Sequence, residues 1–441
     1  MTDVPAPAAP PDPADDAARP GSVLVVGGGV AGFAAVRELR RRGYAGELTL
    51  VDPQGLPYDR PPLSKEFLTG DADAHRLLLA PPSWFAEHRV ALVARRAERL
   101  ELDDGAARPR IVLDDGAVLT ADAVVLAPGG RPRPLAVPGG DHPDVVVLRT
   151  RADAERIAAR LHFGARVTVV GGGFTGAEVA SAAREALAAV TLVSASAAPA
   201  LAAVGPALAA RLHAMHAERG VDVLEGLVTR IDHHDVDASD ADAPHRVHVA
   251  LADGTEAAVP ADLVVVAVGI VPDTALAEAA GLAVDGGILV DAAGRTSHPA
   301  VFAAGDAVRR RAPEGEEAAP ADAARHWEPA LHSGQDVAAA ILGEDVPGRG
   351  APWFWSDRHG VHVEGAGSML PVPGGRIVDR SVRGTVVAGF SLDADGRMTG
   401  AAAVDDPMAV KAARRIIDRG IIVDPARLTD PDVPVKALLR G

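Results

Sequence analysis

Two copies of one glycine-rich pattern, 144 residues apart, constrain the fold of this chain more than any other feature. Residues 23–40 read VLVVGGGVAGFAAVRELR and residues 167–184 read VTVVGGGFTGAEVASAAR, with eight of the 18 aligned positions identical. In each copy a G-x-G-x-x-G core follows an apolar β-branched run and opens a helical pattern, which is the context this motif requires. The spacing predicts two β-turn-α units that each bind a dinucleotide.

The glycines of each core have separate physical tasks. In the first copy Gly27 allows a tight turn, Gly29 lets the main chain approach a pyrophosphate, and Gly32 permits close packing of helix on strand. The helix N-terminus that follows attracts the phosphates. The corresponding positions of the second copy are Gly171, Gly173 and Gly176. A chain that holds two dinucleotides is most simply a flavin–nicotinamide oxidoreductase.

The residue that ends the second strand of each unit bears on which dinucleotide is bound. Asp52 lies 20 residues after Gly32, where a carboxylate accepts hydrogen bonds from a ribose diol, although a turn aspartate is the alternative. The second unit has Ser194 at this place. A serine removes a repulsion against a 2′-phosphate, but residues 194–204 contain no Arg or Lys to neutralise one. Both NADH and NADPH therefore stay open.

Composition excludes several classes of function. The 441 residues contain no cysteine, which excludes disulfides, thiolate metal sites and a dithiol redox mechanism. A net charge of −16 argues against non-specific binding of nucleic acid. The 15 histidines show no ligand spacing, so we expect no metal site.

The N-terminus and the hydropathy pattern bear on location. Residues 1–21 are rich in Pro, Ala and Asp and predict a disordered tail without the basic start or apolar stretch of a signal peptide. No apolar run approaches the roughly 18 residues that a membrane helix needs. We expect a cytoplasmic protein with neither a membrane nor a nucleic-acid partner.

Periodicity along the chain predicts an α/β fold with two Rossmann-like dinucleotide-binding domains and a C-terminal α+β domain. Residues 353–404 alternate as antiparallel strands, and helices are expected at 327–342 and 407–419. The expected strands and helices of the two glycine-rich units are 22–26, 31–42 and 47–52, then 166–170, 175–187 and 189–193.

Six further motifs resemble one family. PYDRPPLSK (57–65) is the most specific of them, and the resemblance, which includes the paired glycine motifs, extends over nearly all of residues 22–441. The chain resembles the FAD-dependent ferredoxin reductases of bacterial oxygenase systems, the putidaredoxin-reductase-like family, with a glutathione-reductase-like fold. The other motifs are APGGRPR (127–133), AVGIVPD (267–273), RTSHPAVFAAGD (295–306), HWEPALHSG (326–334) and PWFWSD (352–357).

The resemblance implies an FAD-binding domain of residues 22–135 and 270–345, an NAD(P)-binding domain of 136–269 and an interface domain of 346–441. It places Lys65 beside the flavin N5 and Trp327 at a helix start against the flavin ring, and we expect these two to be the catalytic residues. The other residues it assigns to the flavin are Gly27, Gly29, Gly32, Asp52, Arg60, Pro61, Arg131 and Asp306. Those it assigns to the nicotinamide dinucleotide are Gly171, Gly173, Gly176, Glu178, Ser194 and Gly269.

Without the resemblance, these residues have ordinary roles: Lys65 solvated in a proline-rich loop, Asp306 as a helix N-cap, and Trp327 packed in an interface. The chain also departs from the family at Ser194 and at Arg325, where an acid is usual.

The activity that the resemblance implies is hydride transfer from NAD(P)H to FAD, followed by single-electron transfer to an iron–sulfur ferredoxin that serves an oxygenase. The alternatives are a reductase of rubredoxin or of a small organic acceptor, and a redox-sensing flavoprotein like apoptosis-inducing factor. The Arg runs 40–42 and 309–311 and Arg358 are candidates for docking an acidic ferredoxin, with solvated surface as the plainer interpretation of the runs.

Overall fold

The computed structural model describes residues 19–102, 108–234, 243–311 and 325–440, so most of the expected tail, residues 1–21, lies outside the described residues. The chain forms two compact units, and each is built from separate stretches of sequence. The first unit contains 1–59, 78–130 and 272–348, and the second contains 60–77, 131–271 and 349–441. The domain boundaries expected from the sequence stay a prediction.

The first unit is organised by a parallel sheet of order β18-β7-β1-β2-β3. Its strands and helices are β1 (Ser22–Val26), α1 (Val30–Arg41), β2 (Glu47–Val51), α3 (Pro82–Glu87), β3 (Val90–Val93), β4 (Ala97–Glu101), β5 (Arg110–Leu113), β6 (Val118–Thr120), β7 (Ala123–Leu126), α8 (Ala275–Ala279), β17 (Ile288–Val290), β18 (Val301–Ala303), η3 (Gly305–Ala307), β19 (Val308–Arg310) and α9 (Trp327–Ile341).

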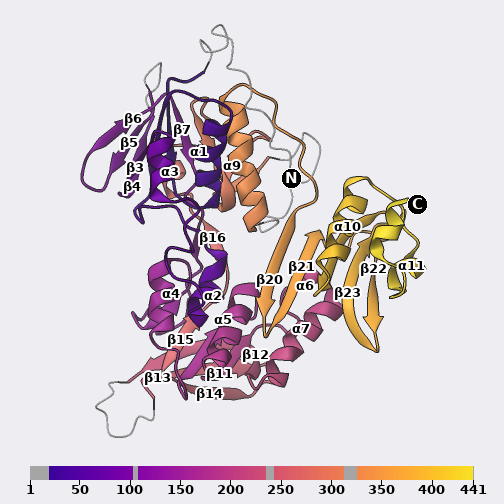
Figure 1. Ribbon diagram of the computed structural model, residues 1–441. Helices are drawn as coiled ribbons and strands as arrows, with labels where there is room; N and C mark the ends of the chain where they lie inside the picture. Colours follow the sequence, from indigo (N-terminus) through magenta and orange to yellow (C-terminus); the bar gives the residue numbers. More distant parts are fainter. Residues whose placement is uncertain (1–18, 103–107, 235–242, 312–324, 441) are drawn as a thin grey trace. The chain divides into compact units, whose positions relative to one another are not determined.

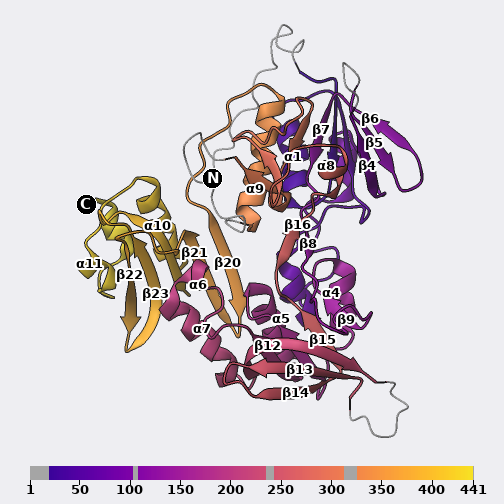
Figure 2. The same cartoon turned by 180° about the vertical axis from the view of Figure 1, so that it is seen from behind.

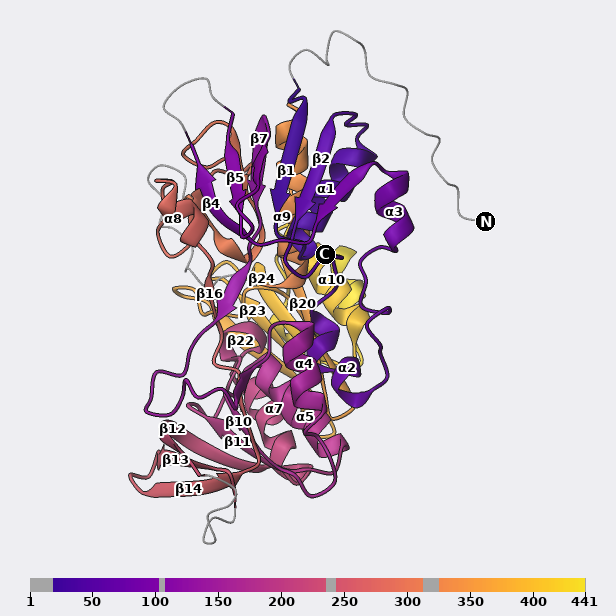
Figure 3. The same ribbon diagram turned by 90° about the vertical axis from the view of Figure 1, so that its left-hand side faces the viewer.

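Both faces of this sheet are buried, which explains the continuous apolar run of β1. Val23 and Val25 pack in a core with α1 and α9, while Leu24 and Val26 pack on the opposite face with the antiparallel sheet β4-β5-β6. Figure 1 shows α1 and α9 side by side, and Figure 3 shows β4 and β5 next to the strands of the parallel sheet.

The second unit contains two sheets. A seven-stranded sheet has the order β14-β13-β12-β11-β10-β15-β9. The strands β9, β15, β10, β11 and β12 are parallel to one another. The strands β12, β13 and β14 are antiparallel and lie next to one another in Figure 2. The elements of this part are η2 (Pro61–Ser64), α2 (Glu66–Thr69), β9 (Val145–Val147), α4 (Arg151–Ala158), β10 (Arg166–Val170), α5 (Phe174–Glu185), β11 (Ala189–Ser194), α6 (Leu201–Val204), α7 (Pro206–Glu218), β12 (Asp222–His233), β13 (His245–Leu251), β14 (Glu256–Ala261) and β15 (Leu263–Val266).

The C-terminal part of this unit is an antiparallel sheet of order β20-β21-β24-β23-β22. Helix α10 packs on it around Phe390, Val410 and Ile416. The elements are β20 (Trp353–Arg358), β21 (Val361–Gly367), β22 (Arg376–Val382), β23 (Thr385–Leu392), β24 (Met398–Val404), α10 (Pro407–Asp418), α11 (Pro425–Thr429) and η4 (Val435–Arg440). Two short strands, β8 (Gly130–Pro132) and β16 (Ile270–Pro272), form a separate two-stranded sheet.

The expected α/β fold with two glycine-rich units and a C-terminal antiparallel sheet is confirmed. The expected strand 22–26 is β1, and the helix expected at 327–342 is α9, one residue shorter. No helix in the described part of the chain is both long enough and apolar enough to cross a membrane.

The packing of α1 on α9 generates a stability prediction. A Cβ atom at Gly334 would lie 2.1 Å from the main-chain oxygen of Ala31, so Gly334→Ala must push the two helices apart. We expect a loss of about 2 kcal/mol or more in the free energy of unfolding, measured by urea denaturation. Gly348→Ala is the matched control, because a Cβ there meets nothing within 4 Å. Equal unfolding midpoints for the two variants would contradict this account.

Candidate functional site

The first glycine-rich turn joins β1 to α1 and leaves its centre open. Gly27 has a φ of 106°, and a Cβ there would lie 2.1 Å from the carbonyl oxygen of Ala127. A Cβ at Gly32 would lie 1.9 Å from the carbonyl oxygen of Gly27, so α1 begins directly against the turn. A Cβ at Gly29, by contrast, meets nothing within 4 Å. The main chain at Gly29 is therefore accessible to a ligand group at the N-terminus of α1.

Asp52 follows β2 at the same edge of the sheet. Its side chain is buried, with one carboxylate oxygen accepting the N–H of Gly28 at 2.6 Å and the other the N–H of Gln54 at 2.7 Å. A carboxylate has about four acceptor positions, so acceptor capacity remains on both oxygens. The two main-chain contacts fix the carboxylate next to the open turn, as a ribose-binding residue requires.

The second turn repeats this geometry between β10 and α5. Gly171 has a φ of 111°, and a Cβ there would lie 2.4 Å from the carbonyl oxygen of Ala267. A Cβ at Gly176 would lie 1.8 Å from the carbonyl oxygen of Gly171, while Gly173 is open. The two units thus contain the same turn at the same place in the sheet.

Strand register places Ser194 at the position of Asp52. Val26 pairs with Val51 in the first unit, and Val170 pairs with Val193 in the second, so the next residue in each case is Asp52 or Ser194. The Ser194 side chain is buried, and its hydroxyl donates to the carbonyl oxygen of Ser196 at 2.8 Å. Its only proton is therefore used within the turn and is not donated to a ligand in this conformation.

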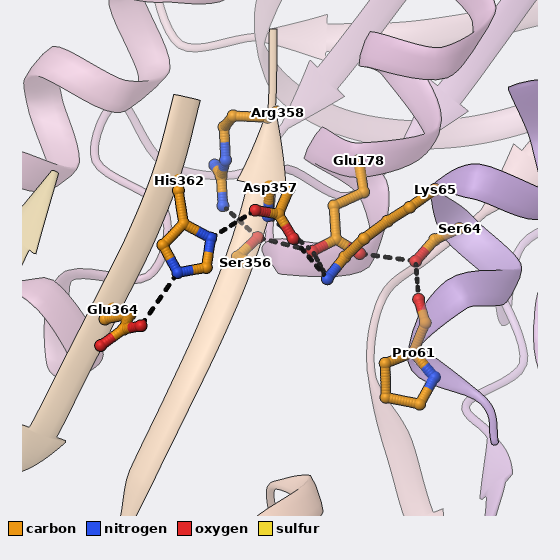
Figure 4. Close-up of polar contacts among 9 residues, drawn as sticks. All are labelled: Pro61, Ser64, Lys65, Glu178, Ser356, Asp357, Arg358, His362 and Glu364. Carbon is orange, nitrogen blue, oxygen red and sulfur yellow. Dashed lines mark hydrogen bonds and ion pairs between the residues drawn. The ribbon is translucent and has the colours of Figure 1, made fainter. Parts of the chain in front are cut away.

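Lys65 is buried in the second unit instead of solvated, so the plainer interpretation of this residue was wrong. Its side chain is 10% exposed, and its ammonium nitrogen lies 2.9 Å from Asp357 and 3.6 Å from Glu178. Figure 4 shows the three charged groups pointing toward one another. Lys65 comes from the turn between η2 and α2, Glu178 from α5 and Asp357 from β20.

Glu178 is held by hydroxyl groups on both sides. Ser64 donates to one carboxylate oxygen at 2.5 Å, and Ser356 donates to the other at 2.6 Å. The side chain of Glu178 is 8% exposed, so these contacts compensate for the removal of its charge from water. Lys65 and Glu178, which the resemblance assigns to the flavin and to the nicotinamide dinucleotide, thus lie in one network.

The network continues to residues that the sequence did not single out. On β20 and β21, Asp357 and His362 are register partners, and Nδ1 of His362 lies 2.5 Å from the Asp357 carboxylate. Nε2 of His362 lies 3.0 Å from Glu364. Asp357 ends the PWFWSD motif, which was the available signal for it, but no motif pointed to His362 or Glu364.

Two pKa shifts accompany this arrangement. Burial disfavours the charged form of Asp357, but hydrogen bonds from His362 and Lys65 outweigh it and lower the pKa of Asp357. Burial also opposes protonation of His362, but Asp357 and Glu364 outweigh it and raise the pKa of His362 above 6.5. Asp357 is consequently charged at neutral pH, and His362 gains a proton more readily than an ordinary histidine.

Trp327 is the first residue of α9, at the helix start where we expected it. Its indole N–H donates to the carboxylate of Asp59 at 2.7 Å. Asp306 lies in η3, whose N-cap is Ala304, so the helix N-cap interpretation of Asp306 was wrong. Burial lowers the pKa of His326, the N-cap of α9, against the attraction of Asp306. His326 is therefore neutral at pH 7.

The remaining predicted site residues, Arg60, Pro61, Arg131 and Gly269, belong to the second unit. Arg60 donates to the carbonyl oxygen of Arg149 at 3.1 Å, and Pro61 begins η2. Gly269 has a φ of 99°, and its carbonyl oxygen accepts the N–H of Arg133. The side chain of Arg131 is exposed. Their roles toward a cofactor stay predictions.

Most of the arginines considered for docking an acidic ferredoxin are bound by other residues of this chain, so fewer of them are available to a partner. Arg358 is buried at 4% exposure, with its guanidinium 5.6 Å from the ring centre of Phe174, so it cannot contact a partner protein. Five of the other six side chains are held as follows: Arg40 by main-chain oxygens including that of His88, Arg41 and Arg42 by Glu38, Arg309 by Asp285, and Arg310 by Asp336. The sixth, Arg311, is exposed. In the 40–42 run Arg40 and Arg42 are partly buried, whereas the Arg41 side chain is 65% exposed, as the solvated interpretation expects.

Several histidines of the second unit lie close together. His216 and His359 hydrogen-bond each other at 2.9 Å, and burial lowers their pKa values to about 3 and about 4. Both rings are neutral at pH 7. Among the described residues, no group of three or more His, Cys, Asp or Glu side chains has an arrangement that could hold a metal ion.

Two family models match the chain. Residues 21–332 match the pyridine nucleotide-disulphide oxidoreductase model, and residues 353–439 match a reductase C-terminal model. Over 433 residues the chain is 35% identical to the ferredoxin–NAD(+) reductase component of the anthranilate 1,2-dioxygenase system of Burkholderia cepacia, covering 94% of this chain and 98% of that protein. It is 33% identical to putidaredoxin reductase of Pseudomonas putida, covering 95% and 96%.

Solved structures of ferredoxin reductases are also similar to this chain along nearly its whole length. A crystal structure of a covalent putidaredoxin reductase–putidaredoxin complex matches with a TM-score of 0.84 and 32% identity, covering 95% of this chain and 98% of the matched chain. The ferredoxin reductase for the CYP199A2 system of Rhodopseudomonas palustris matches with a TM-score of 0.84 and 30% identity, covering 95% and 99%. The similarity thus extends over both glycine-rich units and the C-terminal sheet.

Proposed function

This chain belongs to the pyridine nucleotide-disulphide oxidoreductase family, and from that membership we propose that it is a ferredoxin reductase of a bacterial oxygenase system. It takes electrons from NAD(P)H and delivers them to an iron–sulfur ferredoxin. The observation that supports this best is the similarity to reductase components along 94–95% of the chain, including the C-terminal module. The cytoplasmic location stays a prediction.

The turn of the first unit fits the ADP half of FAD. The open main chain at Gly29 accepts a pyrophosphate, and the fixed carboxylate of Asp52 accepts the ribose hydroxyls. When bound, FAD supplies the conversion between a two-electron donor and one-electron acceptors. The 441 residues contain no cysteine, so this chain offers no thiol of its own for the disulphide chemistry in the family's name.

The turn of the second unit fits the nicotinamide dinucleotide. Gly173 is open at the N-terminus of α5, and Glu178 lies one turn further along the same helix. Ser194, in the place of Asp52, leaves the strand end without the carboxylate that binds a ribose diol. We therefore propose that the site takes both NADH and NADPH and does not strongly reject the 2′-phosphate.

Lys65 and Trp327 are the proposed catalytic residues. Asp357 and Glu178 fix the ammonium of Lys65, which would offer a preorganised positive charge to the negative charge that develops on a bound flavin. Trp327 opens a 15-residue helix whose N-terminal N–H groups favour negative charge, and Asp59 fixes its indole. Both residues act by position and electrostatics.

The acceptor class can be tested by steady-state turnover. We expect NAD(P)H-dependent reduction of a [2Fe–2S] ferredoxin such as putidaredoxin with kcat/KM at least about tenfold above that for rubredoxin. The ferredoxin rate falls as ionic strength rises, because charge steering is screened, whereas reduction of the small dye dichlorophenol-indophenol is unaffected. Preferential turnover of rubredoxin or of the dye would favour a different acceptor, and negligible turnover of all three would favour a redox-sensing protein.

Lys65→Met tests the proposed electrostatic role. We expect flavin reduction by NAD(P)H to slow by about tenfold to 100-fold in stopped-flow measurements, because the preorganised charge is lost while Gly29 and Asp52, which would hold the ADP half of FAD, are unchanged. Lys411→Met, on the exposed side of α10, is the matched control. An unchanged rate of flavin reduction in a variant with full flavin content would mean that Lys65 has only a structural role.

Ser194→Glu tests the choice of nicotinamide. A carboxylate at this strand end accepts the ribose diol and repels a 2′-phosphate, so the NADH/NADPH ratio of kcat/KM should rise about tenfold. Ser83→Glu places the same charge on exposed α3 of the other unit and should leave the ratio unchanged. If the ratio does not move in Ser194→Glu, this strand end does not contact the ribose.

A further inference from the structure

The buried ion pair of Lys65 is connected to a histidine at the surface. Asp357 contacts Lys65 through one carboxylate oxygen, at 2.9 Å, and His362 through the other, at 2.5 Å. The Lys65 and Glu178 side chains are 10% and 8% exposed, whereas those of Asp357 and His362 are 40% and 38% exposed. In Figure 4 the four groups form one row that ends at His362 and Glu364.

The charged groups around His362 come from three strands. Asp357 on β20 and Glu364 on β21 contact its ring, and Asp405, after β24, accepts its main-chain N–H at 2.9 Å. Glu364 also accepts the indole N–H of Trp353 at 3.1 Å, which fixes the carboxylate. The ring thus lies between two oriented carboxylates, one of which it shares with Lys65.

Protonation of His362 changes the net charge of this network. Glu178, Asp357 and Glu364 contribute three negative charges. Lys65 and the buried Arg358, which donates to Ser356 at 3.1 Å, contribute two positive charges. For these five side chains and His362 the sum is zero when His362 is protonated and −1 when it is neutral. Asp405, which contacts only the main-chain N–H of His362, adds one negative charge in both states. Because the Asp357 carboxylate contacts both Lys65 and His362, the change in the charge of His362 acts on Lys65 through this shared carboxylate.

We propose that His362 is a positioning residue that sets the positive potential of Lys65 through Asp357 and so makes flavin reduction depend on pH. This rests on the proposed function for its effect on rate, but the coupling of the three side chains does not. With His362 protonated, Asp357 divides its attraction between two cations, and the potential at Lys65 is more positive. With His362 neutral, Asp357 compensates Lys65 alone.

The direction of the pH effect follows from the contacts. Asp357 and Glu364 outweigh burial and raise the pKa of His362 above its ordinary value, so the ring keeps its proton to a higher pH than a free histidine does. The rate of flavin reduction is highest below this pKa and declines as pH rises through it. We expect a decline of about twofold to fivefold, because the groups are partly exposed and solvent screens them.

The coupling is tested on the purified full-length protein by NMR titration of histidine ring signals, assigned by their loss in His362→Gln. Removing the ammonium in Lys65→Met should raise the pKa of His362 by about 0.5 to 1 unit, because a competing cation is gone. Asp357→Asn should lower it toward 6.5. In the Asp357→Asn background, Lys65→Met should shift it by less than about 0.2 units, since the shared carboxylate is absent.

The effect on rate is tested by stopped-flow flavin reduction between about pH 6 and 9. His362→Gln keeps hydrogen-bonding ability without a titrating charge, so its profile should lose the decline and stay near the high-pH rate of the wild type. His75→Gln, an exposed histidine outside the network, is the matched control. A decline that persists unchanged in His362→Gln would overturn the proposal.

Different results would contradict the proposed function and the coupling between Lys65, Asp357 and His362. If the wild type shows no NAD(P)H-dependent reduction while Lys65→Met still shifts the pKa of His362, the proposed function fails and the coupling stands. If Lys65→Met leaves the pKa of His362 unchanged, the coupling fails whatever the activity. Should Lys65→Met not fold, Asp357→Asn decides alone, because an unchanged pKa of His362 in that variant contradicts the shared carboxylate.

Discussion

A side chain on the first or third glycine of either nucleotide turn would occupy the space of a main-chain carbonyl. The distances are 2.1 and 1.9 Å in the first turn and 2.4 and 1.8 Å in the second. This constraint fixes where each helix begins relative to the central strand of its sheet, and it brings the residue after the neighbouring strand, Asp52 or Ser194, to the edge of the turn. The placement of both proposed cofactor sites depends on these two close approaches.

Most of the fold could be predicted because its signals are local. The apolar run of β1, the glycines and the helical period of α1 lie within 20 residues, and the same holds for β10 and α5. The discontinuous construction of both units could not be predicted from local pattern, because it depends on which distant segments share a core, such as Ala31 with Gly334. Short elements such as α4 and η2 were also missed, since a few residues contain too little periodicity.

The candidate site was predictable only where a motif named its residues. Lys65 and Glu178 were assigned to cofactors from separate motifs, but their contact, across 113 positions of sequence, needed the fold. His362 and Glu364 belong to no motif, and Asp357 became informative only when register paired it with His362. The expectation that Arg358 docks a partner was wrong. Its charge suggested the surface, whereas strand alternation on β20 turns Ser356 and Arg358 inward while Trp355 and Asp357 remain partly exposed.

The contact between α1 and α9 also has a consequence for the nascent chain during synthesis. At about 5 to 20 residues per second, a ribosome needs roughly 15 to 60 seconds between Ala31 and Gly334. Throughout that interval the apolar face of α1, including Val36 and Leu39, lacks the helix that covers it. Until about residue 341 has been made, the nascent first unit therefore exposes the part of the α1 surface that α9 covers.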